Sequence, residues 1–290
     1  MSATLVDERH TTRQAAVATQ KACTWCGSLV VLSCLLGLAV FAHFAPPPAA
    51  SLNDAAIGAV FRDHTTGIQI GMMLMVFGAA LLGPFVAVIS AHMRRVEGPR
   101  PTLSYLQLVL GTCFIMEIIF PCMAVQVAAY RPERLDVVQQ VLNDLGWLTF
   151  FGVASTAFVQ CVIIGALILQ DRRTTPVFPR WSGYFNIWVG LMFTPGTVVV
   201  FFKTGPLSWT GLFIFWLPFL AFFAWLIVMT VLLLKAIDHE TAEDIATGAA
   251  GAGGGADPRV GAFAQQLALV TAELGDMRER LNRVESQPIR

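Results

Sequence analysis

Six long apolar runs dominate this sequence and restrict the folds open to it. Each run has few charges and reaches the length of about 18 residues that a helix needs to cross a bilayer. The runs span residues 27–44, 67–92, 104–129, 143–169, 182–202 and 208–234. Backbone groups in lipid must be hydrogen-bonded within the chain, so such runs form helices. The sequence therefore predicts an all-α, polytopic membrane protein with a six-helix transmembrane bundle over residues 27–235.

Composition agrees with this class of protein. Hydrophobic residues make up 56% of the chain and charged residues 13%. Soluble domains contain about 45–50% and about 25% of these residues. The formal net charge is zero, and we find no basic run or nucleic-acid motif. We therefore expect the lipid bilayer as a partner and exclude nucleic acid.

The distribution of Lys and Arg predicts an orientation. On one side of the predicted bundle lie Arg9, Arg13, Lys21, Arg94, Arg95, Arg100, Arg172, Arg173, Arg180 and Lys235. The other side holds only Arg62, Arg131, Arg134 and Lys203. Positively charged flanks are retained in the cytoplasm. We expect a multi-pass plasma-membrane protein with both termini cytoplasmic, the N-terminal segment 1–26 included, and an even number of spans agrees with this.

A heptad pattern follows the predicted bundle. After an acidic, then Gly/Ala-rich linker over 236–258, apolar residues recur at alternating spacings of three and four within 259–286. The a positions are Val260, Leu267, Leu274 and Leu281, and the d positions are Phe263, Val270, Met277 and Val284. Such a seam predicts a coiled-coil oligomerisation helix.

Charges beside this seam indicate how the helices pair. In a parallel assembly Glu273 faces Arg278 of a second copy, and Arg280 faces Glu285, so the signs are opposite at both contacts. Leu at a with Val at two d positions favours a trimer or tetramer over a dimer. The alternative is a single amphipathic helix on the membrane surface or against the bundle, because two glycines weaken the helix.

Glu117 is the one acidic residue at the centre of a predicted span. A carboxyl group there costs about 2.5–3.5 kcal/mol on insertion scales and must face the protein interior or a wet cavity. It is a candidate proton-carrying or ligand-anchoring group. The alternative is a structural hydrogen bond to another helix, for which Gln160 and Asn186 are the candidate partners.

Further candidates lie near the outer face and in the last two spans. Asp144 opens the fourth span and is either a second functional acid or an N-terminal helix cap. Trp188 belongs to a group of deep aromatic residues that either line an apolar cavity for a lipophilic small molecule or face lipid. The other members of this group are Trp216, Trp225, Phe193, Phe201 and Phe215.

Small and cyclic residues predict the local shape of the spans. Pro84, Pro121, Pro195 and Pro218 each fall inside a different predicted span. Because proline removes a helical hydrogen bond, we expect kinks near these sites. Gly67 and Gly71 have the small-xxx-small spacing that permits close helix contact.

Metal and cofactor sites are not indicated. His43, Asp63 and His64 come from separate loops without ligand spacing, so we expect no metal. Cys23 and Cys26 form a CxxC without a second pair. Motifs for nucleophilic hydrolysis, zinc hydrolysis or nucleotide binding are absent, so no cofactor is expected and an enzyme built on a standard site is disfavoured.

Three functions fit these features. The first is a homo-oligomeric membrane protein that binds or transports a small or lipophilic ligand through its bundle. The second is a membrane-embedded enzyme acting on an isoprenoid- or sterol-like substrate, with Glu117 and Asp144 as acid and base in one cavity. The third is an anchored scaffold that assembles partners through the coiled coil. We favour the first, because the sequence indicates assembly more clearly than catalysis.

Overall fold

The computed structural model describes the backbone of residues 2–253 and the side chains of residues 13–242. Within residues 2–253 the regular structure is entirely helical. Six helical segments are long and apolar enough to cross a membrane: Arg13–Phe41, Thr65–Glu97, Thr102–Tyr130, Asp136–Gln170, Arg180–Phe201 and Leu212–Ala242. The predicted helical class is thus confirmed, and so is the number of helices long and apolar enough to span a membrane. The heptad residues of 259–286 lie outside the described part of the chain.

The elements follow one another as α1 (Ser2–Cys34), η1 (Leu35–Phe41), α2 (Asp54–Asp63), α3 (Thr65–Glu97), α4 (Thr102–Tyr130), α5 (Asp136–Gly152), α6 (Ser155–Gln170), α7 (Arg180–Phe193), η2 (Thr194–Phe201), η3 (Leu212–Trp216) and α8 (Leu217–Gly253). The chain divides into two units, Met1–Asp238 and His239–Arg290, of which the first holds the helix bundle. The predicted boundaries of the N-terminal segment and the linker stay predictions.

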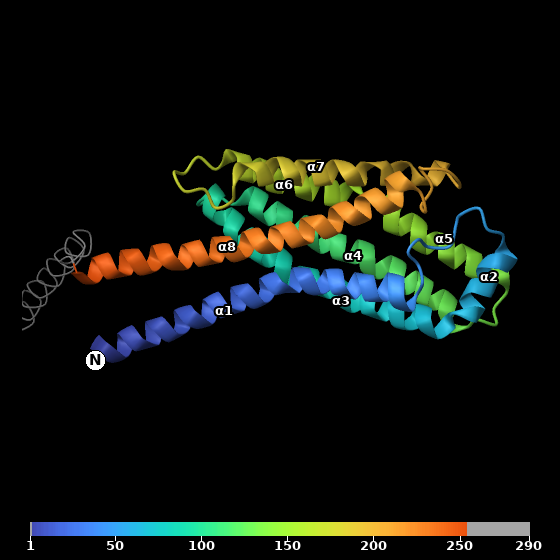
Figure 1. The fold of residues 1–290 in the computed structure, drawn as a ribbon, viewed down its shortest axis with the longest axis horizontal. Helices are drawn as coiled ribbons and strands as arrows, with labels where there is room; N and C mark the ends of the chain where they lie inside the picture. The colour runs from blue at the N-terminus through green and yellow to red at the C-terminus, as the bar shows by residue number, and fades with distance from the viewer. Residues whose placement is uncertain (1, 254–290) are drawn as a thin grey trace, which may run out of the picture. The chain divides into compact units, whose positions relative to one another are not determined.

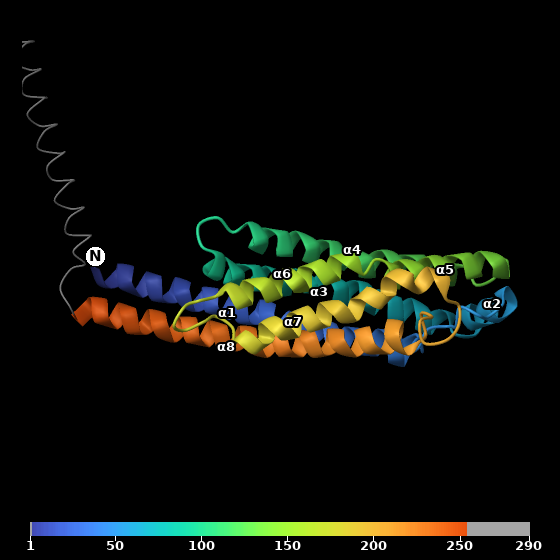
Figure 2. The same ribbon diagram turned by 90° about the horizontal axis from the view of Figure 1, so that it is seen from above.

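Within the first unit, α3 and α4 lie at the centre of the packing. Helix α3 contacts α1 and α4, and α4 also contacts α5 and α6. Helices α6 and α7 run side by side in both views (Figures 1 and 2). Helix α8 joins this arrangement through Trp225, whose ring meets Phe85 of α3 edge-on and whose indole N–H donates to the Asn186 side-chain oxygen of α7 at 2.7 Å.

Two pairs of spans cross at glycines. A Cβ on Gly37 of η1 would lie 2.7 Å from the Gly71 carbonyl oxygen of α3, and a Cβ on Gly71 would collide with the Gly37 carbonyl oxygen. Gly165 of α6 and Gly183 of α7 form a second such contact, at 2.7 Å in one direction and 3.1 Å in the other. Small residues are the usual means of close helix contact in membranes. Both glycines singled out in the sequence fit this role, since a Cβ on Gly67 would collide with the Phe41 carbonyl oxygen of the first span.

Four of the six spans depart from regular α-helix. The first ends in a π-helical segment, η1, and the last begins with another, η3. The fifth tightens to a 3-10 helix from Thr194, and the fourth is broken between α5 and α6 at Val153 and Ala154. Two of these departures coincide with prolines at which kinks were expected. Pro195 lies at the start of the 3-10 segment, and Pro218 lies just after the π-helical segment η3. By contrast, α3 and α4 continue as α-helix through Pro84 and Pro121.

Helix α2 is a short element between the first two spans, at the end of the bundle opposite the start of α1 (Figure 1). Its N-terminus is capped by Asn53, whose side-chain oxygen accepts from the Ala56 backbone N–H at 2.9 Å. Arg62 near its end forms an ion pair with Asp136 at the start of α5. The cap fixes the start of α2, and the ion pair holds α2 against the fourth span, an arrangement that hydropathy does not reveal.

The connections at the other end are anchored by carboxylates. Glu97 accepts from the backbone N–H groups of Leu103 and Ser104 at 2.8 and 2.9 Å and so caps the start of α4. Asp171, between α6 and α7, accepts from Arg173 and from the Val177 N–H. Burial alone would raise the Asp171 pKa, but these hydrogen bonds and the Arg173 charge outweigh burial and lower the pKa below its ordinary value.

The glycine crossing predicts a position-specific effect in α3. Gly71→Ala forces its new methyl against the Gly37 carbonyl oxygen, so we expect a loss of about 1–3 kcal/mol in unfolding free energy. Gly83→Ala in the same helix is the matched control, since its nearest neighbour would be Ile115 at 3.9 Å. Unfolding of the detergent-solubilised protein measures both. Equal losses in the two variants would contradict the assigned crossing.

Candidate functional site

A cavity of about 70 Å³ lies inside the first unit, among all six spans. Its walls are formed by Cys34, Met75, Phe114, Glu117, Ile118, Phe150, Phe151, Val153, Ala154, Ala157, Phe193, Gly196, Ile214, Phe215, Pro218, Phe219 and Phe222. A water molecule needs about 10–15 Å³ by this kind of measure, so the space equals roughly five waters. Adjustment of the flexible lining would admit a small apolar body.

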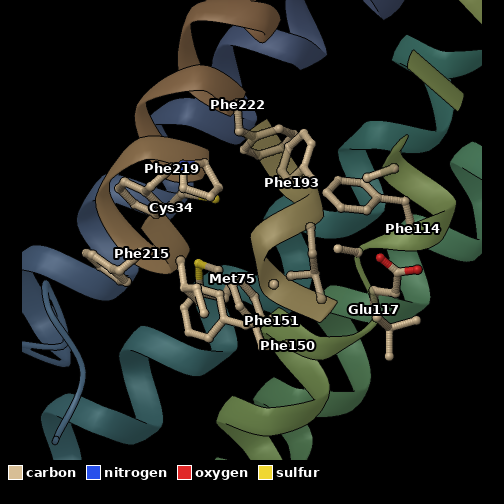
Figure 3. Close-up of a pocket in the computed structure, with 17 residues that line it drawn as sticks. Cys34, Met75, Phe114, Glu117, Phe150, Phe151, Phe193, Phe215, Phe219 and Phe222 are labelled. Carbon is tan, nitrogen blue, oxygen red and sulfur yellow. The ribbon is translucent and has the colours of Figure 1, made fainter. Parts of the chain in front are cut away.

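The lining is strongly aromatic. Seven of its residues are phenylalanines, and Figure 3 shows their rings arranged around the space. Phe114 of α4 meets Phe193 of α7 and Phe222 of α8 edge-on, with ring centroids 6.2 and 5.5 Å apart. A second group consists of Phe150, Phe151, Phe215 and Phe219, and its Phe215 and Phe219 rings are stacked at 5.3 Å. The cavity therefore offers aromatic surface from several helices.

The cavity lies where the spans leave α-helical geometry. Val153 and Ala154, at the break of the fourth span, line it together with Gly196 of η2 and Phe215 of η3. Gly196 permits close packing here, because a Cβ at this position would collide with the Phe151 carbonyl oxygen. Non-helical backbone at membrane depth is tolerated only where protein or a cavity surrounds it. The departures from helix and the cavity thus form one feature of the bundle.

Glu117 supplies the one carboxyl group of the lining. It lies near the middle of α4, is half-buried, and its Oε1 accepts a hydrogen bond from the Thr156 hydroxyl at the start of α6. Gln160 and Asn186 were its candidate partners from the sequence, and the structure instead gives Thr156. The break at Val153 and Ala154 starts α6 at this depth and so places the hydroxyl beside the carboxyl group.

Gln160 and Asn186 are both buried but have other surroundings. The Gln160 side-chain nitrogen lies 2.8 Å from where a Gly111 Cβ would be, so this amide packs between α6 and α4. The Asn186 side-chain nitrogen donates to the Ser182 carbonyl oxygen at 2.7 Å, and its side-chain oxygen accepts from Trp225. Neither residue lines the cavity. Asn186 instead joins α7 to α8.

Asp144 and Trp188 also lie away from the cavity lining. Asp144 is in α5, where it interacts with Asn143 and with Lys203. Trp188 is 47% exposed and stacks on Phe185 with ring centroids 6.2 Å apart, as an outward-facing aromatic residue would. Of the five predicted ligand or proton residues, only Glu117 is therefore placed at the cavity.

The other deep aromatics divide between interior and surface. Phe193 and Phe215 line the cavity, and Trp225 is buried beside it, stacked on Phe222 at 6.4 Å. Phe201 and Trp216 are exposed. One part of this aromatic group therefore lines or adjoins the cavity, and the other part is exposed. The sequence did not distinguish the two parts, because hydrophobicity is the same on a lipid-facing and an inward-facing surface of a span.

Other candidate chemistry does not assemble at the cavity. His43, just after the first span, stacks on His64, just before α3, with ring centroids 5.6 Å apart, and neither lines the cavity. Across the part of the chain whose side chains are described, no group of three His, Cys, Asp or Glu residues is arranged to hold a metal ion. Cys23 and Cys26 are free thiols.

Neither a family model, nor a curated protein, nor a solved structure matches this chain.

Several lining residues were not among the sequence candidates. The missed phenylalanines are Phe114, Phe150, Phe151, Phe219 and Phe222. Thr156 was missed because hydroxyls in spans commonly bond their own helix backbone. The break that places Thr156 did leave a signal in the sequence. The residues from Gly152 to Thr156, which follow two phenylalanines, are mostly small, and their side chains offer little packing to keep a long helix continuous.

The contact between Thr156 and Glu117 predicts a loss of stability on removal of the hydroxyl. Thr156→Val leaves the carboxyl group without its donor, and we expect a loss of about 1–2 kcal/mol in unfolding free energy, with Thr156→Ser close to wild type. Thr112→Val is the matched control, because the Thr112 hydroxyl donates only to the Leu108 carbonyl oxygen of its own helix. Indistinguishable Thr156→Val and Thr112→Val proteins would refute the contact.

Proposed function

We propose that this chain is a homo-oligomeric integral membrane protein that binds or transports a small lipophilic ligand in the cavity beside Glu117. One observation supports the proposal above all others: all six spans contribute to a phenylalanine-rich space that contains a single carboxyl group. Apolar pockets with few polar groups are typical ligand sites in helix bundles. An intramembrane acid is by default a functional candidate.

The broken spans support movement of a ligand as well as binding. Discontinuous helices at membrane depth are a common feature of transporter sites. Here the fourth, fifth and sixth spans each change geometry at residues that line the cavity. Short non-helical segments are also where a helix can change direction at small energetic cost. We therefore favour a protein whose ligand site lies at joints between helical segments.

The enzyme hypothesis receives less support. It requires Glu117 and Asp144 to act on one substrate, but Asp144 does not line the cavity that contains Glu117. The scaffold hypothesis rests on the heptad residues alone and gives no reason for a carboxyl group beside an aromatic cavity. Ligand binding accounts for both features together.

The location proposed for this protein is the plasma membrane, with both termini in the cytoplasm. Support comes from the six apolar helices and from the excess of Lys and Arg around the termini and the α3–α4 and α6–α7 connections. We also propose that parallel pairing of residues 259–286 joins several bundles through the linker 236–258, as a trimer or tetramer.

A small neutral aromatic diazirine tests the ligand site. Photolysis with the protein in nanodiscs should place adducts on the α8 segment that carries Phe219 and Phe222, as well as on lipid-facing residues. Ala157→Phe fills the cavity from α6 and should remove the α8 adducts while keeping the lipid-facing ones. Val159→Phe is the matched control, because Val159 faces outward from the same helix and is 39% exposed. Peptide mass spectrometry locates the adducts.

The lipid-facing adducts show that each variant was labelled in its folded, membrane-embedded form. Adducts on the cavity lining that persist in Ala157→Phe, or that are missing from wild type, would argue against a ligand site at this place.

Truncation tests the assembly. Native mass spectrometry of the full chain should show a discrete trimer or tetramer, and a chain ending at Ala246 should be monomeric, because it lacks every heptad residue. Replacement of both Leu274 and Leu281 by Lys in the full chain should have the same effect as truncation. A monomeric full chain would contradict the coiled coil and leave the ligand site unaffected.

A further inference from the structure

We infer that the cavity selects a lipophilic cation: a molecule with one positive charge on an apolar body, such as an aryl- or alkyl-ammonium. This inference rests on the proposed ligand site and adds the charge and chemical class of the ligand. Three properties of the lining support it: the unpaired acid, the arrangement of the phenylalanine rings, and the scarcity of other polar groups.

The first property is the electrostatic setting of Glu117. The Thr156 hydroxyl is its hydrogen-bond donor, and no ion pair joins the carboxyl group to a described Lys, Arg or His. Three described acids near the two ends of the bundle differ in this respect: Asp136 pairs with Arg62, Asp171 with Arg173 and Asp238 with Lys21. A carboxylate offers about four acceptor positions. The Thr156 hydroxyl occupies one of these positions, and a ligand cation could bind at the others.

The second property is the aromatic group closest to the acid. Phe114 lies three residues before Glu117 on α4, so both side chains are on neighbouring positions of one helix face. Phe193 and Phe222 complete a group of three rings with centroid separations of 5.5–6.5 Å. Ring faces attract cations within about 6 Å of the centroid, most strongly where water is excluded. Figure 3 shows the Glu117 carboxyl group and these rings bordering the same space.

The third property excludes other ligand classes. The lining has no Lys, Arg, Ser, Thr, Asn or Gln side chain. An anion would meet the Glu117 carboxylate without a compensating cation. A sugar, nucleotide or peptide would lose several hydrogen bonds to water on entry, and the lining offers no partners to replace them. A single charge on an apolar body leaves no such group unpaired.

Access from the bilayer is compatible with this class. Glu117 is only half-buried, and its neighbours Met116 and Phe120 are 54% and 58% exposed on the outer surface of α4. Amphiphilic cations concentrate in membranes, and an acid near the lipid-facing surface is reached without passage through the whole bundle. The α4–α6 side, where Thr156 meets Glu117, is therefore the expected side of entry.

A matched pair of probes tests the charge. Benzyltrimethylammonium and neopentylbenzene have the same shape and differ in one central atom, which is a cationic nitrogen in the first and a neutral carbon in the second. Stabilisation of the full chain in nanodiscs against probe concentration gives a Kd for each. Glu117→Gln should raise the Kd of the cation by at least about tenfold and leave that of the neutral probe within about twofold.

Glu117→Gln keeps an oxygen that accepts from Thr156, so the fold should be retained. Asp144→Asn, an acid that does not line the cavity, is the control and should change neither Kd. If both probes bind wild type and Glu117→Gln affects both equally or neither, the cation inference fails and the lipophilic site stands. Binding of the neutral probe alone also overturns the cation class. If neither probe binds, the ligand site itself is wrong.

Discussion

The need to hydrogen-bond every backbone group within the chain governs this structure. In six apolar segments without water, α-helix satisfies that need by default. Each departure from helix then requires surrounding protein to make it tolerable. In this bundle the departures in the fourth, fifth and sixth spans meet around one cavity, and packing of the other spans encloses them. The cavity is thus a consequence of where the helices are interrupted.

The interruption of the fourth span also determines the setting of the acid. A continuous helix from Asp136 to Gln170 would carry Thr156 in register with α5. The break at Val153 and Ala154 frees α6 to take its own direction against α4, and Thr156 reaches the Glu117 carboxyl group. The same break exposes Phe150 and Phe151 to the cavity. One short segment therefore relates the backbone geometry, the aromatic lining and the electrostatics of the site.

Features of this fold are predictable from the sequence only where they leave a distinct physical signal in it. The six spans follow from hydropathy alone, and their positions agree with the structure within several residues at most ends. Glu117 was identifiable because a charge in hydrocarbon is exceptional. The break of the fourth span has no proline, and Pro84 and Pro121, where kinks were expected, lie within continuous α-helices. The partner of Glu117 depends on that break, so Thr156 could not be found from spacing.

Trp188 and Phe193 look alike in sequence, since both faces of a span are apolar, and only the packing separates them.

The glycine crossings have a consequence for how such a protein can evolve. At Gly37, Gly71 and Gly165 a Cβ would collide with the backbone of the facing helix, and at Gly183 a Cβ would press on the Leu169 side chain and lie 3.1 Å from the Gly165 carbonyl oxygen. The phenylalanines of the cavity are less restricted, because exchange among large apolar side chains preserves volume and usually costs less than about 1.5 kcal/mol. Relatives of this chain can therefore diverge in ligand preference by exchanging Phe, Leu and Met around the acid, while four residues that carry no side chain keep the architecture recognisable.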